Sequence, residues 1–462
     1  MMRRLTFLLL LGVAACAGPR PAVPPAASVV SPDKWRIPSP VGADVDPAWW
    51  QAFGDPSLSD LVERALAHND DIAIAASRVE QARAQFQISK AQRLPSLTAS
   101  ASGGRDRHVD AFGQDVDETA GQGGLTISYD LDLFGRLRNA SAAARARLLG
   151  SQAARDSVRL AVAAATAQGY VNLLALDAKL SVARQTLVTR DIAFKTMQRR
   201  ADAGYSTQLE LRQAEAEYRA TEQLIPEIQL AIHRQEDGLS LLIGEAPGEI
   251  ARGKSLDSLS VPSAVAVLPS TLLRRRPDIT EAEQQIVAAD RSLDAVRASF
   301  LPDVQLNGTG GFVASTLLMT NPLSVFSIGG GILETLFDGG RRRAEQRGSA
   351  AQRDAAAFAY RKTVLNAFRE TEDALAGVAL SGDQQVAIEK ERDAVSRLLT
   401  LAQNRYRAGY SPYLEQVDAE RSLLQADLSL VQVRAAHLSS YISLYQALGG
   451  GWSLETANLA AR

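Results

Sequence analysis

The sequence predicts a mainly helical chain that adds four strands to a membrane β-barrel shared with other copies of itself. Three observations predict this fold class. One unit occurs twice, two long proline-free windows have a helical composition, and two pairs of segments alternate apolar with polar residues. The 462 residues carry 50 basic against 52 acidic side chains, so net charge gives no reason to expect a nucleic-acid partner.

The duplication is clearest at a turn that occurs twice. Ala203-Gly204-Tyr205-Ser206 recurs later in the chain as Ala408-Gly409-Tyr410-Ser411, and both copies continue with Leu and Glu at matching positions. The period is too long for a solenoid, whose repeats span about 20 to 50 residues. Each half therefore supplies one part of a larger, pseudo-symmetric assembly.

The N-terminus has the pattern of a bacterial export signal. Arg3 and Arg4 precede an apolar run, and small residues stand directly before Cys16, the single cysteine of the chain. We expect a signal peptide over 1–15, and the site resembles the lipobox of bacterial lipoproteins, which implies cleavage before Cys16 and its acylation. An unmodified cysteine is the alternative. Residues 17–47 are rich in proline, alanine and serine, which is typical of an extended tether.

The first half has the composition of three helices. We expect them at about 57–92, 136–202 and 207–243. The second of these would be roughly 100 Å long at 1.5 Å per residue, more than a compact domain holds. Gly204 suits the left-handed cap that ends it, and Ser206 suits the N-cap of the helix that returns.

The second half repeats this order. We expect helices at about 278–299, 340–407 and 412–448, with Gly409 and Ser411 as the corresponding caps. Each half therefore contains one long helical hairpin.

Between the short and the long helix of each half, apolar and polar residues alternate. This period of two predicts strands at about 94–106, 121–134, 301–313 and 325–337, the last with its pattern loosened by glycines 329–331. A soluble sheet with one face on a core is the alternative. Lipidation and the polar opposite faces favour membrane strands.

Membrane strands would have to close into a barrel. No later segment has 18 consecutive apolar residues, so a spanning part must be a closed barrel, and the smallest membrane barrels use eight strands. Two chains would give eight strands around a filled interior, and three would give twelve around an open lumen. The small residues on the polar faces favour the open version.

Specific blocks are spread over nearly the whole mature chain. They are Trp49-Trp50, Phe53-Gly54-Asp55-Pro56 with Leu58, Leu61, Ala65-Leu66, Asn69, Ala82-Arg83, Asp130-Leu131-Asp132-Leu133-Phe134-Gly135, Leu273, Arg275-Arg276-Pro277-Asp278-Ile279, Phe337-Asp338-Gly339-Gly340 and the turn from Tyr406 to Ser411. In these blocks the chain resembles the TolC-like outer-membrane efflux proteins, and within them the lipoprotein branch that serves resistance-nodulation-division (RND) pumps. Ala17 after the cysteine usually accompanies sorting of lipoproteins to the outer membrane.

The resemblance implies a homotrimer. Its twelve-stranded outer-membrane β-barrel, with four strands per chain, would continue into a periplasmic α-barrel of twelve helices. The repeats would be 57–243 and 278–448. A mixed equatorial region would be drawn from 16–56, which includes the lipidated tether, from the linker 244–277 and from the tail 449–462.

The resemblance also implies a passive channel. Small molecules such as drugs or toxic compounds would enter from an inner-membrane RND pump through a periplasmic adaptor protein. A duct for type I polypeptide secretion and a periplasmic coiled-coil scaffold lipoprotein without a pore are the alternatives. The four histidines lack metal-ligand spacing and no catalytic motif is visible, so we expect neither an enzyme nor a cofactor beyond the lipid on Cys16.

Leu414 and Asp418 match the periplasmic gate positions of the family. They are four residues apart and share a helix face, so three-fold symmetry would form one apolar and one acidic ring. An exposed leucine and aspartate at a helix start is the alternative. The first half has Gln213 where the second has Asp418, so we expect a single acidic ring.

Three arginines flank the second turn, Arg405, Arg407 and Arg421, and they could pair across a closed tip. The resemblance assigns adaptor docking to both tips, namely Ala203, Gly204, Tyr205, Ala408, Gly409 and Tyr410. A purely structural role, in which glycine permits the tight turn, explains Gly204 and Gly409 equally well. The two tyrosines discriminate better, because an exposed aromatic residue on a tip has no folding reason to be there.

Overall fold

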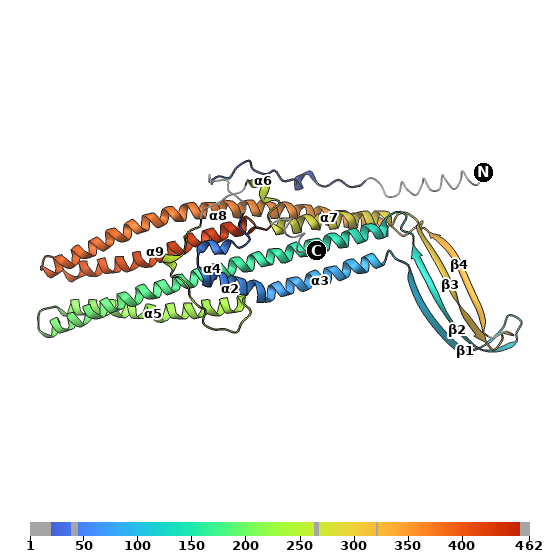
Figure 1. The fold of residues 1–462 in the computed structure, drawn as a ribbon, viewed down its shortest axis with the longest axis horizontal. Coiled ribbons are helices and arrows are strands. Elements are labelled where there is room, and N and C mark those ends of the chain that lie inside the picture. The colour runs from blue at the N-terminus through green and yellow to red at the C-terminus, as the bar shows by residue number, and fades with distance from the viewer. Residues whose placement is uncertain (1–19, 38–44, 263–267, 320–321, 453–462) are drawn as a thin grey trace. The chain divides into compact units, whose positions relative to one another are not determined.

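The computed structural model describes residues 20–37, 45–262, 268–319 and 322–452, which form two compact units (Figure 1). The first unit contains the described parts of 1–28, 77–152 and 281–362. The second contains those of 29–76, 153–280 and 363–462. Among the described helices, none has an 18-residue window apolar enough to cross a membrane.

The first unit is built on one antiparallel sheet. Its strands are β1 (Ser96–Val109), β2 (Asp115–Asp130), β3 (Asp303–Ser315) and β4 (Leu323–Leu333), hydrogen-bonded in that order. The register places Leu97, Ile127, Gly308 and Ile328 in one row across the sheet. Because side chains alternate along a strand, Leu125, Leu306, Phe312 and Phe326 lie on the same face as this row.

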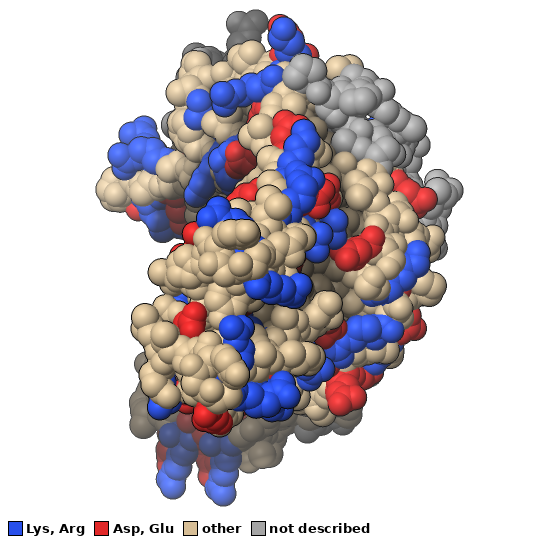
Figure 2. Space-filling model, turned by 90° about the vertical axis from the view of Figure 1, so that its left-hand side faces the viewer, with Lys and Arg blue, Asp and Glu red and all other residues tan. Residues whose placement is uncertain are grey.

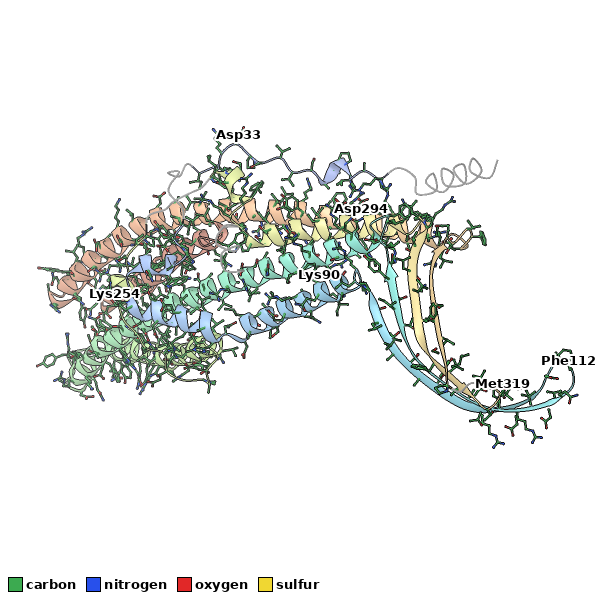
Figure 3. All side chains as sticks on the ribbon, turned by 45° about the vertical axis from the view of Figure 1, so that its right-hand side comes forward. Asp33, Lys90, Phe112, Lys254, Asp294 and Met319 are labelled. Atoms are coloured by element: carbon green, nitrogen blue, oxygen red, sulfur yellow. The ribbon has the colours of Figure 1, made fainter. Side chains whose placement is uncertain are left out.

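The opposite face of the sheet is mainly polar, although Val313, Val325 and Leu333 also lie on it. Ser128 donates to Asn307 at 2.6 Å, Thr309 and Ser327 lie 2.7 Å apart, and Ser315 donates to Glu118 at 2.5 Å. The four predicted strands are therefore present, with one apolar and one mainly polar face. Figure 3 shows the exposed Phe112 and Met319 at the turns of the two strand pairs, at the same end of the sheet.

The strand bounds differ from the prediction at both ends of the sheet. The strand β1 continues to Val109, and β2 already begins at Asp115. Beyond residue 104, cross-strand ion pairs replace the apolar pattern. Arg105 binds Asp117 at 2.5 Å, and Arg107 binds Asp115. The fourth strand ends at Leu333 instead of 337, and the carboxylate of Glu334 accepts from Arg342 at 3.0 Å.

The long helices begin beside the sheet at equivalent arginines. The helix α4 (Arg136–Asp202) starts with Arg136, which donates to Asp130 at the end of β2 at 2.5 Å. In the second repeat, the helix is α8 (Arg341–Arg407), and its Arg342 donates to Glu334, which directly follows β4. The duplication therefore extends to the ion pairs that attach each long helix to its strand.

The N-terminal segment lies against helices of the first unit. Arg20 pairs with Asp290 of α7 (Pro277–Ala298) at 3.1 Å, and Arg353 of α8 donates to the carbonyls of Pro21 and Ala22 at 2.5 and 2.9 Å. Arg353 is only 1% exposed. The segment from Arg20 to Ala22 is thus bound to the helices, a contact that its composition, typical of an extended tether, does not predict.

The second unit contains the two helical hairpins. The helix α5 (Gln208–Leu242) returns along α4, and α9 (Tyr413–Ala447) returns along α8 (Figure 1). Shorter elements are η3 (Trp49–Phe53), η4 (Leu256–Ser258) and α6 (Pro269–Leu272). The 3₁₀ turn η2 (Pro25–Ala27) belongs to the first unit.

The helix expected at 57–92 is two helices. Asn69 ends α2 (Pro56–His68) and begins α3 (Asp70–Ala91). Its side-chain oxygen accepts from the amides of Asp71 and Ile72 at 3.0 and 3.2 Å, as an N-cap does, and its amide group donates to the carbonyl of Leu242.

A buried aspartate joins three segments of the second unit. Asp55 caps α2 by accepting from the amide of Ser57, and its other oxygen accepts from the Tyr170 hydroxyl at 2.9 Å and the amide of Lys254 at 3.0 Å. Asp55 and Tyr170 are both almost completely buried. Burial raises the pKa of Tyr170 to about 12, so this phenol stays a hydrogen-bond donor at neutral pH.

Candidate functional site

Both hairpin tips turn at a glycine in the left-handed conformation. Gly204 has φ +76° and Gly409 has φ +78°. The next amide in each case reaches back over the last helical turn, from Tyr205 to the Arg200 carbonyl at 2.7 Å and from Tyr410 to the Arg405 carbonyl at 2.9 Å. This is the Schellman geometry, and it confirms the glycine caps expected from the sequence.

The expected serine N-caps are wrong in both repeats. In the first, the cap is Thr207, which forms a reciprocal capping box with Glu210, while the Ser206 hydroxyl lies 4.0 Å from the Met197 sulfur. A Glu three residues after Thr207 favours this box over a lone serine. In the second, Pro412 occupies the cap without a side-chain bond, and the hydroxyl of Ser411 is buried without a partner.

The tips themselves are open to solvent. Tyr205 and Tyr410 are each 80% exposed, and a Cβ added at Gly204 or Gly409 would meet nothing within 4 Å. Ala203 and Ala408 are exposed as well. Figure 2 looks onto the side on which the hairpins end, where Lys and Arg are interspersed with Asp and Glu.

Beneath the tips, an apolar cluster joins the two hairpins. It contains Met197, Leu211, Ala214, Tyr413 and Val417, and Tyr406 packs against it. The Tyr406 and Tyr413 rings lie 5.3 Å apart, and the Arg200 guanidinium is 5.7 Å from the centre of the Tyr406 ring. Cation–π contact and apolar burial therefore both connect the hairpins.

A carboxylate connects the hairpins next to this cluster. Glu217 of α5 accepts from Arg421 of α9, with 2.5 Å between Oε1 and Nη2. Its Oε2 lies 2.9 Å from Nη1 of Arg190 on α4. Nη1 also donates to the hydroxyl of Thr221 at 2.6 Å. We call Glu217, Arg190 and Arg421 the Glu217 network.

Most of the Glu217 network is buried. The side chains of Arg190 and Glu217 are 5% and 7% exposed, against 55% for Arg421. Of the three residues, only Arg421 is expected at the tip from its position in the sequence. Spacing could have identified Glu217, since it lies on the buried stripe of Leu211, Ala214 and Thr221, where a charge needs a partner.

The residues expected at the gate lie around this network. Leu414 is 46% exposed, and the Asp418 side chain is 60% exposed and 3.5 Å from Arg421. Arg405 pairs within its own hairpin, with Glu415 at 3.8 Å. Arg407 is exposed and forms no ion pair within the described part of the chain. Of the three arginines, only Arg421 pairs with the other hairpin.

A second acidic side chain lies close to the Glu217 network. Glu420 accepts from Gln416 at 2.8 Å. Burial raises the pKa of Glu420, and its repulsion from Glu217 adds to the increase, although Gln416 and Arg190 oppose it.

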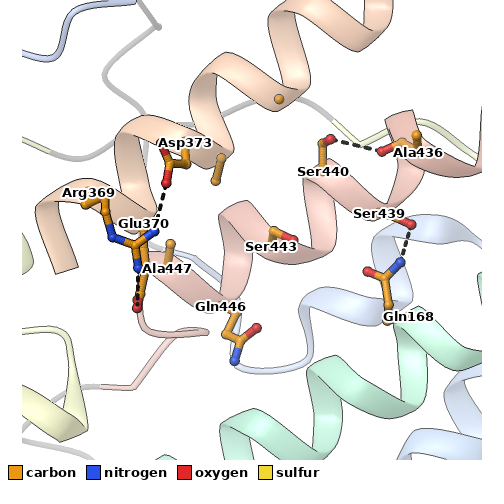
Figure 4. Close-up of a pocket in the computed structure, with 12 residues that line it drawn as sticks. Gln168, Arg369, Glu370, Asp373, Ala436, Ser439, Ser440, Ser443, Gln446 and Ala447 are labelled. Atoms are coloured by element: carbon orange, nitrogen blue, oxygen red, sulfur yellow. Dashed lines mark hydrogen bonds and ion pairs between the residues drawn. The ribbon is translucent and has the colours of Figure 1, made fainter. Parts of the chain in front are cut away.

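The cavity shown in Figure 4 lies between α8 and α9 and has a volume of about 670 Å³. Gln168 of α4 donates to Ser439 there, and Arg369 binds Asp373 at 2.9 Å. These two contacts take up four of the polar side chains that line it. In the described ranges, no three metal-ligating side chains come together.

Comparison with known proteins identifies the family. The model for the outer membrane efflux protein family matches residues 61–245 and 268–450, which contain the two repeats. This chain belongs to the outer membrane efflux protein family. It is 32% identical to the pyoverdine export outer membrane protein OpmQ of Pseudomonas aeruginosa, over 98% of this chain and 97% of that protein.

Two further outer-membrane proteins match this chain over almost its whole length. The outer membrane protein OprJ of Pseudomonas aeruginosa is 32% identical over 96% of this chain and 95% of its own. The solved outer-membrane channel OprN superposes with a TM-score of 0.86 at 27% identity and covers 94% of this chain and 99% of that structure. The chain is thus an outer-membrane channel protein of efflux pumps, as its sequence predicted.

Proposed function

We propose that three copies of the chain form a passive efflux channel whose periplasmic end is held closed by contacts between the hairpins. The observation that carries this proposal is the ion pair between Glu217 and Arg421, which connects the two hairpins of one chain directly below their tips. Separating the hairpins would break it.

A trimer supplies the strands that one chain lacks. Four strands are half of the smallest membrane barrel, whereas three chains give twelve. The apolar face of each sheet would contact lipid. The polar face, with Ser128, Asn307, Thr309 and Ser327, would line a water-filled lumen.

The lipid anchor is proposed on Cys16, which lies outside the described residues. Arg20 supports its placement, because it is bound to Asp290 and Asp294 of α7. Four residues of chain reach at most about 14 Å. The acylated cysteine would therefore stay close to the end of α7, which precedes β3 by four residues.

Small molecules are the proposed substrates. Relatives are named for export of pyoverdine and for efflux of toluene, two compounds of different chemistry. The channel would pass them unchanged from an inner-membrane RND pump. A periplasmic adaptor would dock at the hairpin tips, where Tyr205 and Tyr410 offer equivalent exposed rings.

The gate is proposed at Leu414 and Asp418. Both side chains are exposed in the single chain and lie one helical turn apart. Around a three-fold axis they would form an apolar constriction and an acidic ring that attracts cations.

Conductance in planar bilayers tests the proposal. We expect purified wild-type protein to show a low conductance, because its periplasmic end is held closed, and multivalent cations to block this conductance from the periplasmic side. Asp418→Asn should weaken this block, whereas Glu415→Gln, an exposed carboxylate one turn away, should leave it unchanged. Absence of conductance would favour a scaffold. Equal block in all three proteins would reject the acidic ring.

A further inference from the structure

A second cavity of about 670 Å³ lies entirely within the second unit. Four separate segments line it: the N-terminal segment with Trp49 and Trp50, the adjoining ends of α2 and α3, the part of α4 around Arg159, and the turn that ends in Trp452. Three of the chain's four tryptophans therefore contribute to one cavity. Nothing in the efflux mechanism uses it.

The turn before Trp452 leaves room for this cavity. Gly449, Gly450 and Gly451 all have positive φ, at +89°, +57° and +78°. A Cβ at Gly450 would lie 2.3 Å from Cδ1 of Leu160, much closer than an ordinary contact allows, and 3.4 Å from the indole nitrogen of Trp49. The wall is therefore backbone where any other residue would place a side chain.

The walls are mainly apolar, and two of their side-chain donors have no partner among the described residues. Asp156 is already used, because it accepts from the Trp452 indole at 3.0 Å and from Arg155 at 2.7 Å. The indole nitrogen of Trp50 is buried and has no hydrogen-bond partner in the part of the chain that the structure describes. Arg159 is exposed and forms no ion pair with any described residue. A buried donor without a partner, such as the Trp50 indole, is rare, and the exposed guanidinium of Arg159 adds a cationic donor to the same cavity.

We propose that this cavity binds an anionic compound with an apolar ring body. The carboxylate or sulfonate would accept from the Trp50 indole and pair with Arg159. The ring would pack against the tryptophans and Leu160, in the offset or edge arrangements that aromatic groups prefer. The volume lies within the range of about 300 to 1,000 Å³ that is typical of small-molecule sites. The inference does not depend on the proposed channel.

Binding to the full-length protein, kept in amphipol so that no detergent competes, tests this inference. The probe is 2-naphthoate, and 2-naphthylmethanol is its uncharged control with the same ring. We expect saturable binding of 2-naphthoate by calorimetry, a higher melting temperature and altered tryptophan fluorescence. A loss of at least about fivefold in affinity is expected for the alcohol, since bonds to charged groups are the stronger ones.

Three variants distinguish a specific binding site from nonspecific adsorption of the probe. Arg159→Gln should lower the affinity for 2-naphthoate by about fivefold to tenfold and leave the affinity for the alcohol unchanged. Arg184 is another exposed arginine on α4, and Arg184→Gln should change neither affinity. Trp50→Phe keeps an aromatic ring but removes the unpartnered donor. It should therefore lower the affinity for 2-naphthoate without lowering the melting temperature of the free protein.

Three results would overturn the inference. They are the absence of saturable binding at millimolar probe, equal affinity for acid and alcohol, and equal effects of Arg159→Gln and Arg184→Gln. None of them bears on conductance, so the channel proposal stands or fails separately.

Discussion

Glu217 binds Arg421 of the opposite hairpin at 2.5 Å while its other oxygen binds Arg190 of its own hairpin at 2.9 Å. One carboxylate thus serves a buried ion pair that stabilises the first hairpin and a half-exposed pair that connects it to the second. The two functions can be separated by mutation, because each arginine can be removed alone.

Arg421→Gln should loosen the contact between the hairpins with little loss of stability. The Arg421 side chain is 55% exposed, so we expect a cost of about 1 kcal/mol or less. If the contact holds the channel closed, conductance in planar bilayers should rise. Arg405→Gln removes an arginine that pairs only within its hairpin and should leave conductance at the wild-type level.

Glu217→Gln should be more damaging than Arg421→Gln. It leaves the buried Arg190 without its carboxylate, and breaking such a buried pair costs about 3 to 5 kcal/mol. Chemical unfolding of the two variants compares these costs. Equal losses would show that the exposed and buried pairs contribute alike, contrary to this account.

Gly204→Ala and Gly409→Ala should destabilise the tips by similar amounts. Both glycines have φ near +77° and open space around them, so only the backbone conformation is affected, at about 1 to 2 kcal/mol. Asn should cost less than Ala at both positions, because it tolerates this conformation better. A much larger loss at one site would indicate a contact that these open turns do not contain.

Asp55→Ala should destabilise the second unit by about 2 to 4 kcal/mol, because it removes an N-cap and leaves the buried Tyr170 hydroxyl without its acceptor. Asp60→Ala, an exposed residue of the same helix, is the control. Tyr170→Phe should restore part of the loss when combined with Asp55→Ala. Additive effects of the two changes would contradict the hydrogen bond between them.

Glu420→Gln should raise stability at neutral pH. Burial raises the pKa of Glu420 above its ordinary value of 4.5, so the folded chain holds this proton more tightly than the unfolded chain does. The favourable contribution of the protonated form is complete below the unfolded value and is lost as pH rises through the folded one. Melting temperatures of variant and wild type should therefore differ most above the folded pKa and converge toward pH 4. Glu415→Gln should show no such convergence.

The sequence predicted most of the fold because its determinants are local. Proline-free windows agree with α4 and α8, the two glycines identify the hairpin tips, and period two identifies the strands. The errors lie where local signals compete. Thr207 with Glu210 replaces Ser206 as the cap, and Asn69 divides a helix that composition favours throughout.

The site was harder to predict because its partners are far apart in the chain. Arg421 is separated from Glu217 by 204 residues, and neither residue type nor spacing relates the two. The duplication does not predict this contact either, since Glu217 and Arg421 do not occupy equivalent positions in the two repeats. The gate rings at Leu414 and Asp418 stay predictions, because they require three chains.

The unequal N-caps of the returning helices have a consequence for motion. The first turn of α5 is fixed by the Thr207 and Glu210 box, whereas α9 begins at Pro412 without any side-chain bond. Local opening of a helix end costs less where its amides lack acceptors. Amide protons at the start of α9 should therefore exchange with solvent sooner than those of α5, and the second hairpin would be the part of the chain that fluctuates first.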